Sequence, residues 1–171
     1  MQSDDRVLDD LLHWIWSWRV QVRRLVESTA AEGRGTDDLA HRRSFSATSY
    51  DEHILLVAGA QLVKALGIAR DRFPACGDLG ETGAALTLLR NLYEHWDEQR
   101  ESFADPSASK VRSGKTFVER FPQGRPWSIA YGADDWVLGG AVSIKSVMLA
   151  LDRLEAVALG LEQRKPENGG A

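Results

Sequence analysis

The chain has 171 residues, enough for one domain with a sizeable core, and its 43% hydrophobic and 27% charged residues are typical of a soluble globular protein. The formal net charge of -4 argues against extended non-specific binding to duplex DNA, which depends on many phosphate contacts, although it leaves room for a small phosphate site. The single cysteine, Cys76, excludes a disulfide framework within the chain. No apolar run approaches the about 20 residues needed to cross a bilayer, and the acidic N-terminus is unlike a secretory signal. We therefore expect a cytoplasmic protein without a membrane segment.

The first predicted helix covers about residues 4–32. Its apolar residues recur at the spacing of one helix face and predict the side that packs in a core: Leu8, Leu11, Leu12, Ile15, Trp18, Val22, Leu25 and Val26. Trp14 and Trp16 lie about 100° to either side of Ile15. Either both rings widen the buried face, as flanking aromatic residues often do, or they form a second contact surface for a partner chain.

A polar stretch, residues 33–48, separates this helix from the next. It is long for a helix connection, and we expect either a mobile lid or a short helical turn around Leu39. The second helix is predicted for residues 49–73, between a Ser-x-x-Glu capping box that starts at Ser49 and the helix-breaking Pro74. Its stripe consists of Leu55, Gly59, Leu62, Leu66, Ala69 and Phe73. The small residues at 59 and 60 should let a neighbouring helix approach closely.

The third predicted helix begins at Asp78, a residue type that caps helices, with Glu81 three positions later. Its helical periodicity continues to Asp105, and Pro106 marks its end. The predicted buried face consists of Ala85, Leu88, Leu89, Leu92, Trp96 and Phe103.

A basic stretch and short strands follow, before a last helix. Three strands are predicted, at residues 116–121, 127–131 and 136–138, with a turn at 132–135. The last helix is predicted from about Val142, and its stripe consists of Ile144, Val147, Met148, Leu151, Leu154, Ala158 and Leu161. Residues 165–171 should be a frayed tail. We therefore predict a single mainly α domain over residues 1–171, a four-helix bundle with a small β-insertion at about 115–139 between the third and fourth long helices.

The residues best suited to catalysis lie in the third predicted helix, where the chain reads Arg-Asn-Leu-Tyr-Glu-His from position 90. A guanidinium binds phosphate, an amide orients a ligand, and an imidazole titrates near neutral pH, a set that suits RNA cleavage. Relative to the buried face, Asn91 and His95 lie on the same side one turn apart, whereas Arg90 lies about 140° from His95. Arg90 and His95 share a site only if the arginine wraps round the helix, the helix is distorted, or a second chain supplies one of them. The alternative is an ordinary exposed ion pair between Arg90 and Glu94.

The stretch Arg90-Asn91-Leu92-Tyr93-Glu94-His95 resembles the signature of the HEPN superfamily, an Arg, a polar residue that is often Asn, and a His shortly after. The continuation Trp96-Asp97-Glu98 resembles the acidic extension of several bacterial branches. The resemblance covers about residues 86–100 and is only architectural elsewhere. It implies a helical bundle and, in many members, a metal-independent RNA endonuclease without a cofactor, active as a homodimer whose paired motifs line one cleft.

By position, the resemblance makes Arg90, Asn91 and His95 the catalytic candidates. His95 would act as general base or acid on the ribose 2′-hydroxyl or the leaving 5′-oxygen, Arg90 would stabilise the transition state, and Asn91 would orient the imidazole or the phosphate. Further substrate contacts are expected from Glu94, Lys110, Arg112 and Lys115. Glu94 would also compete with phosphate for Arg90.

We expect no metal site, because a metal needs three or four convergent ligands and the histidines lack ligand spacing. The predicted function is RNA cleavage, as a toxin or phage-defence effector, with RNA, a second copy and an antitoxin or regulatory protein as partners. One alternative is a non-catalytic HEPN-like dimeric module that binds a protein or nucleotide partner. Another is a structural protein in which Arg90 and His95 are surface residues.

Overall fold

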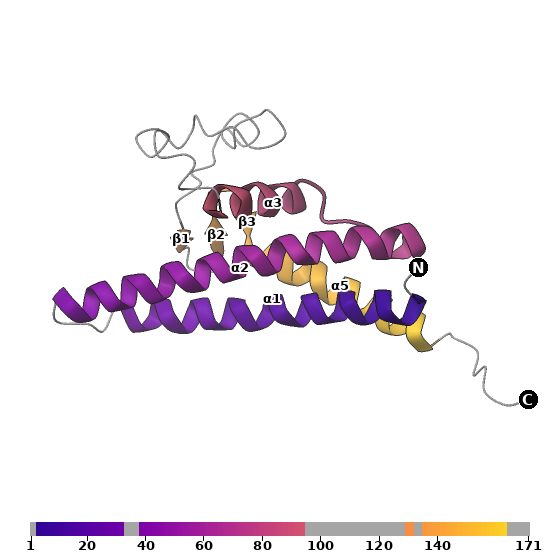
Figure 1. Ribbon diagram of the computed structural model, residues 1–171, viewed down its shortest axis with the longest axis horizontal. Coiled ribbons are helices and arrows are strands. Elements are labelled where there is room, and N and C mark those ends of the chain that lie inside the picture. The colour runs from indigo at the N-terminus through magenta and orange to yellow at the C-terminus, as the bar shows by residue number, and fades with distance from the viewer. Residues whose placement is uncertain (1–2, 33–37, 95–128, 132–134, 164–171) are drawn as a thin grey trace, which may run out of the picture.

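The computed structural model describes residues 3–32, 38–94, 129–131 and 135–163, and for residues 31–32, 38–48 and 129–131 it describes the backbone alone. In these residues the chain is mainly helical with a small antiparallel sheet, as predicted (Figure 1). The helices are α1 (Asp4–Glu32), α2 (Asp38–Arg72), α3 (Gly80–Glu94) and α5 (Ile144–Gln163), and a short 3-10 helix, η1 (Pro74–Cys76), connects α2 to α3. Helix α2 packs against α1 and α3, and α5 packs against α1 (Figure 1).

The core forms where the predicted apolar stripes meet. The largest fully buried side chains are Trp18, Leu8, Leu11, Ile15, Leu25, Leu55, Leu56, Leu62, Leu86, Leu89 and Leu92. Each such side chain stabilises the fold by about 1.5–3 kcal/mol relative to leaving it exposed.

At Gly59 on α2, side chains of α1 and α3 come very close to the backbone. A Cβ atom at Gly59 would lie 2.6 Å from Cζ3 of Trp18 and 3.0 Å from Cδ2 of Leu86. The missing side chain therefore makes room for the buried indole ring, and the close helix approach predicted at this position is confirmed.

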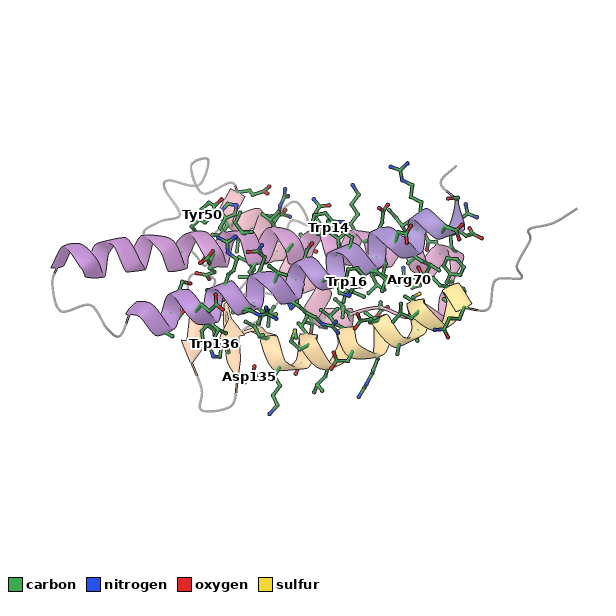
Figure 2. The ribbon with its side chains drawn as sticks, turned by 90° about the horizontal axis from the view of Figure 1, so that it is seen from below. Trp14, Trp16, Tyr50, Arg70, Asp135 and Trp136 are labelled. Carbon is green, nitrogen blue, oxygen red and sulfur yellow. The ribbon has the colours of Figure 1, made fainter. Side chains whose placement is uncertain are left out.

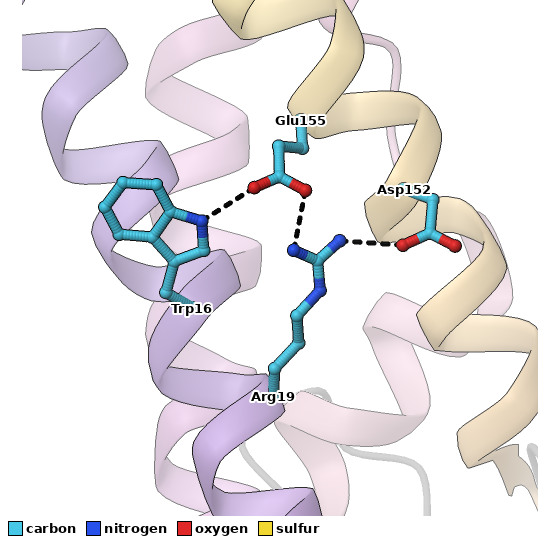
Figure 3. A network of polar contacts seen from close by, with 4 residues as sticks. All are labelled: Trp16, Arg19, Asp152 and Glu155. Carbon is cyan, nitrogen blue, oxygen red and sulfur yellow. Dashed lines mark hydrogen bonds and ion pairs between the residues drawn. The ribbon is translucent and has the colours of Figure 1, made fainter.

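The two tryptophans beside Ile15 have different environments, so the expectation that both widen the buried face is wrong for Trp16. Trp14 packs partly buried against the core on the α2 side of α1, whereas Trp16 is 52% exposed and faces α5 (Figure 2). Its indole N–H donates to Oε1 of Glu155 at 2.7 Å (Figure 3). Arg19 adds bonds to Oε2 of Glu155 at 2.6 Å and to Oδ1 of Asp152 at 2.7 Å, so α1 and α5 are joined by a polar network.

Helix α2 begins earlier than predicted. Its backbone is helical from Asp38, so most of the stretch expected to be a lid or a single helical turn belongs to the helix. Residues 38–48 contain no Gly or Pro, and extending an existing helix costs far less than nucleating one. Ser49 is therefore inside α2 and not its N-cap, so the predicted capping box is wrong. The helix ends at Arg72, immediately before Phe73 and Pro74, close to the predicted boundary.

Helix α3 begins at Gly80, two residues later than predicted, so Asp78 lies two positions before the first helical residue and is not its N-cap. Oδ1 of Asp78 accepts a hydrogen bond from the backbone N–H of Gly80 at 2.9 Å. The described helix ends at Glu94, and the predicted continuation to Asp105 lies outside the described residues.

The sheet contains β1 (Ile129–Tyr131), β2 (Trp136–Leu138) and β3 (Val142–Ser143), in antiparallel order β1-β2-β3. The third strand lies just beyond the predicted insertion, so the last helix begins at Ile144 and not at Val142. The cause is local capping, because Oγ of Ser143 accepts a hydrogen bond from the N–H of Ser146 at 2.9 Å. Oδ1 of Asp135 accepts another from the N–H of Lys145 at 2.9 Å, and Figure 2 shows Asp135 and Trp136 beside the start of α5.

Several predicted features lie outside the described residues: the strand at 116–121, residues 132–134 of the turn, and the tail at 165–171. The expectation that the chain has no membrane segment stays a prediction. By length and composition, Ser49–Arg72 is apolar enough to cross a bilayer, with a mean hydropathy of 1.4 over its most apolar window. Half of that window is buried in the bundle, and the core helices of soluble proteins have the same property.

Candidate functional site

The described part of the candidate motif forms the last turn of α3. Leu92 is 0% exposed and Leu89 is 1% exposed, so the buried face of this turn is the predicted one. Arg90, Asn91 and Glu94 surround that face and are partly exposed. The helix therefore holds these three polar side chains at the edge of the core, within reach of solvent.

Arg90 is bound by two residues of its own helix. Its Nη1 donates to Oδ1 of Asn91 at 3.1 Å, and its Nη2 forms an ion pair with Oε2 of Glu94 one turn later. The side chains of Arg90 and Glu94 are 31% and 27% exposed. The ion pair that the sequence offered as an alternative to a catalytic site is thus present, and it occupies the guanidinium that phosphate would need.

The other predicted site residues cannot be placed relative to this pair. His95, Lys110, Arg112 and Lys115 all lie outside the described residues. The structure brings Arg90, Asn91 and Glu94 together, and the convergence of Arg90 with His95 remains a prediction.

A group of polar residues outside the predicted site lies next to the motif. Asp51 and Glu52, consecutive residues of α2, are each only 7% exposed. Nη2 of Arg24, on α1, lies 3.1 Å from Oδ1 of Asp51. Glu52 forms a hydrogen bond with the hydroxyl group of Tyr93, inside the motif, and the ring of His53 meets the Tyr93 ring edge-on at a centroid distance of 6.0 Å. Polar contacts therefore join α1 and α2 to each other and α2 to the part of α3 that carries the motif.

Burial changes the proton affinity of this pair. It raises the pKa of Glu52, and the hydrogen bond from Tyr93 offsets only part of that effect. Burial also raises the pKa of Tyr93, and the charge of Glu52 and their shared hydrogen bond raise it further. Tyr93 consequently stays protonated at physiological pH and acts as the donor to Glu52.

The signal for this group was in the sequence but had another interpretation. Ser49 and Glu52 fit a capping box, which would place Glu52 in an exposed first turn. Two acids next to the apolar run from Ile54 to Ala60 also fit burial against another helix, but only the path of α3 decides between these cases.

Among the described residues, no group of three or more His, Cys, Asp or Glu side chains could hold a metal ion. Two hollows lie in other parts of the bundle. One, of about 210 Å³, lies between α1 and α2 and is lined by Trp14 and Lys64 among others. The second, of about 280 Å³, lies between α2 and the start of α3, beside Arg70 and Asp78. Neither hollow is lined by Arg90, Asn91 or Glu94.

No family model, no curated protein and no solved structure matches this chain.

Proposed function

We propose that this chain is a metal-independent RNA endonuclease of the HEPN type, with Arg90, Asn91 and His95 as its catalytic residues. The observation that best supports this proposal is the contact between Arg90 and Asn91, 3.1 Å apart on the partly exposed side of the α3 end. A guanidinium and an amide in contact can bind two oxygens of one phosphate group. His95 follows them in the sequence at the spacing of the HEPN motif.

The proposed reaction uses the ribose as its own nucleophile. Either His95 accepts the proton of the 2′-hydroxyl and water protonates the leaving 5′-oxygen, or His95 protonates the 5′-oxygen and water takes the proton of the 2′-hydroxyl. The 2′-oxygen then bonds to phosphorus and the bond from phosphorus to the 5′-oxygen breaks, which leaves a 2′,3′-cyclic phosphate and a 5′-hydroxyl. Arg90 stabilises the negative charge of the transition state, and Asn91 orients the phosphate or the imidazole.

The ion pair between Arg90 and Glu94 must open for this reaction. A pair with this exposure contributes only about 0–1 kcal/mol, so an RNA phosphate can compete with the carboxylate. Lys110, Arg112 and Lys115 are proposed to add phosphate contacts.

The same proposal includes a homodimer. On one straight helix, Arg90 and His95 lie about 140° apart, whereas two copies can bring the arginine of one chain to the histidine of the other. A cytoplasmic toxin or phage-defence effector, held inactive by an antitoxin or regulatory protein, is the biological role we infer. Light scattering at micromolar concentration tests the dimer, and a strict monomer would contradict it.

RNA cleavage in the presence of a chelator tests the chemistry. His95→Ala should abolish cleavage, and Arg90→Ala should reduce its rate by about one to three orders of magnitude. Arg70→Ala is the matched control, because Arg70 is exposed and also forms an ion pair, with Asp78 at 3.2 Å, outside the motif. Cleavage that stops when the chelator is added, or that is unchanged in Arg90→Ala, would refute the proposed site.

A second candidate is a non-catalytic HEPN-like dimeric module that binds a protein or nucleotide partner. The ion pair between Arg90 and Glu94 favours it, since this arginine is already neutralised within its own helix. Glu94→Gln distinguishes the two candidates. If phosphate competes with Glu94 for Arg90, the variant should bind RNA more tightly and lower KM. A parent protein that is dimeric, does not cleave RNA and does not respond to Glu94→Gln would support the module.

A further inference from the structure

The contact between Glu52 and Tyr93 is unusual because it places an ionisable acid where an apolar side chain would pack. Glu52 is 7% exposed on α2, and it is hydrogen-bonded to a hydroxyl group on α3. Replacing a buried polar pair by apolar side chains of similar size often leaves stability unchanged or raises it. What such a pair adds is direction, because a hydrogen bond is satisfied only at one orientation of its partners.

The position of Tyr93 on α3 links this hydrogen bond to the orientation of Arg90 and Asn91. Leu92 is fully buried and marks the centre of the core face of α3. Tyr93 lies about 100° to one side of Leu92, and Asn91 lies about 100° to the other side. A contact that holds Tyr93 therefore sets the rotation of the helix end about its axis, and with it the direction in which Asn91 and Arg90 point.

Two further contacts hold Tyr93 and the turn of α2 that contains Glu52. The ring of Tyr93 meets the ring of His53 edge-on, at an interplanar angle of 84°, so the side chain is held both at its ring and at its hydroxyl group. On the other side of Glu52, Asp51 pairs with Arg24 at 3.1 Å, which ties this turn of α2 to α1. The part of α2 that holds Tyr93 is thus itself anchored in the bundle.

We propose that Glu52 and Tyr93 are positioning residues for the candidate site, and that their buried hydrogen bond fixes the orientation of Arg90 and Asn91 for phosphate. The inference rests on the proposed function for its catalytic consequence. Its structural part, the orientation of two side chains by a buried pair on the far flank of the helix, can be measured without RNA.

The decisive variant is the double substitution Glu52→Met with Tyr93→Phe, since it keeps the volume and removes the hydrogen bond. Tyr50→Phe is the matched control, because Tyr50 lies on the same helix half a turn from Glu52 and is 61% exposed (Figure 2). The first readout is the NMR signal of the Arg90 Nε–H and of the Asn91 side-chain amide, with circular dichroism to confirm folding. The second is RNA cleavage.

The double variant should remain folded while both NMR signals shift or broaden. Cleavage should fall about 10- to 100-fold in kcat with little change in KM, the scale of a misplaced catalytic group. Tyr50→Phe should leave both readouts unchanged.

If the double variant is folded and its Arg90 and Asn91 signals match the parent, the inference is wrong, whether or not RNA is cleaved. If the parent cleaves no RNA but the signals move as expected, the proposed function fails while the positioning role stands. If the double variant does not fold, Tyr93→Phe alone gives the same test.

Discussion

Gly59 offers the sharpest quantitative test of the packing. Replacing Gly by Ala inside a helix normally stabilises it by about 1 kcal/mol, because alanine has the higher helix propensity. At Gly59 the new methyl group would lie 2.6 Å from the ring of Trp18, which is fully buried and cannot move into solvent. Overpacking of this kind costs about 1–3 kcal/mol. Gly59→Ala should therefore be neutral or destabilising by up to about 2 kcal/mol.

Gly67→Ala is the matched control in the same helix. A Cβ atom at Gly67 meets nothing within 4 Å, so only the propensity gain of about 1 kcal/mol should appear. Because this gain is common to both variants, their difference isolates the steric cost, about 1–3 kcal/mol. Urea unfolding of the parent and both variants measures it, and in a chain of this size each kcal/mol also shifts Tm by about 2–4 °C. If Gly59→Ala is as stable as Gly67→Ala, the close contact of α1 and α2 at this point is wrong.

Three further predictions concern charged groups. Burial raises the pKa of Glu52 above its ordinary value of 4.5, so its contribution to stability is complete below that value and is lost as pH rises through the higher pKa of the folded chain. In urea unfolding, Glu52→Gln should therefore gain stability relative to the parent as pH rises above 4.5, and a difference that does not vary with pH would contradict this. Arg19→Met should lower the free energy of unfolding by about 1 kcal/mol at low salt and by less in about 1 M salt, because it removes partly exposed ion pairs between α1 and α5. Thermal melts at both salt concentrations measure the two losses, and equal losses would count against an electrostatic role. Asp135→Ala should cost about 1 kcal/mol at neutral pH, because the backbone N–H groups of Trp136 and Lys145 lose their acceptor. Although burial alone would raise the pKa of Asp135, hydrogen bonds from Ser143 and two backbone N–H groups lower it. The stability that Asp135 contributes is therefore present above the ordinary pKa of 3.8 and is lost as pH falls. The melting temperatures of variant and parent should converge in acid, and a constant gap between them would refute the reasoning.

Local patterns in the sequence determined where most helices lie and which faces they bury. The stripe in α1 predicted the burial of Trp18, and the small residue at 59 predicted a close helix approach. Asp78 marked the start of α3 to within two residues. These features depend on neighbours three or four positions apart, which the helix period brings together whatever the rest of the chain does. The Arg90–Glu94 pair belongs to the same class, since one turn of helix is enough to form it.

Only the tertiary structure decided the partners of polar side chains on different helices. Nothing within α2 says that Glu52 faces Tyr93, because that depends on the rotation and register of α3 against α2. The bonds of Trp16 and Arg19 to α5 likewise depend on how two helices far apart in the sequence are aligned. The early start of α2 is a related case, since the polar residues before Ser49 have no apolar stripe to mark them, and a helix anchored by its packed part extends through them at little cost. Helical periodicity is set by the backbone within a few residues, whereas the partner of a buried acid is set by packing across the whole bundle.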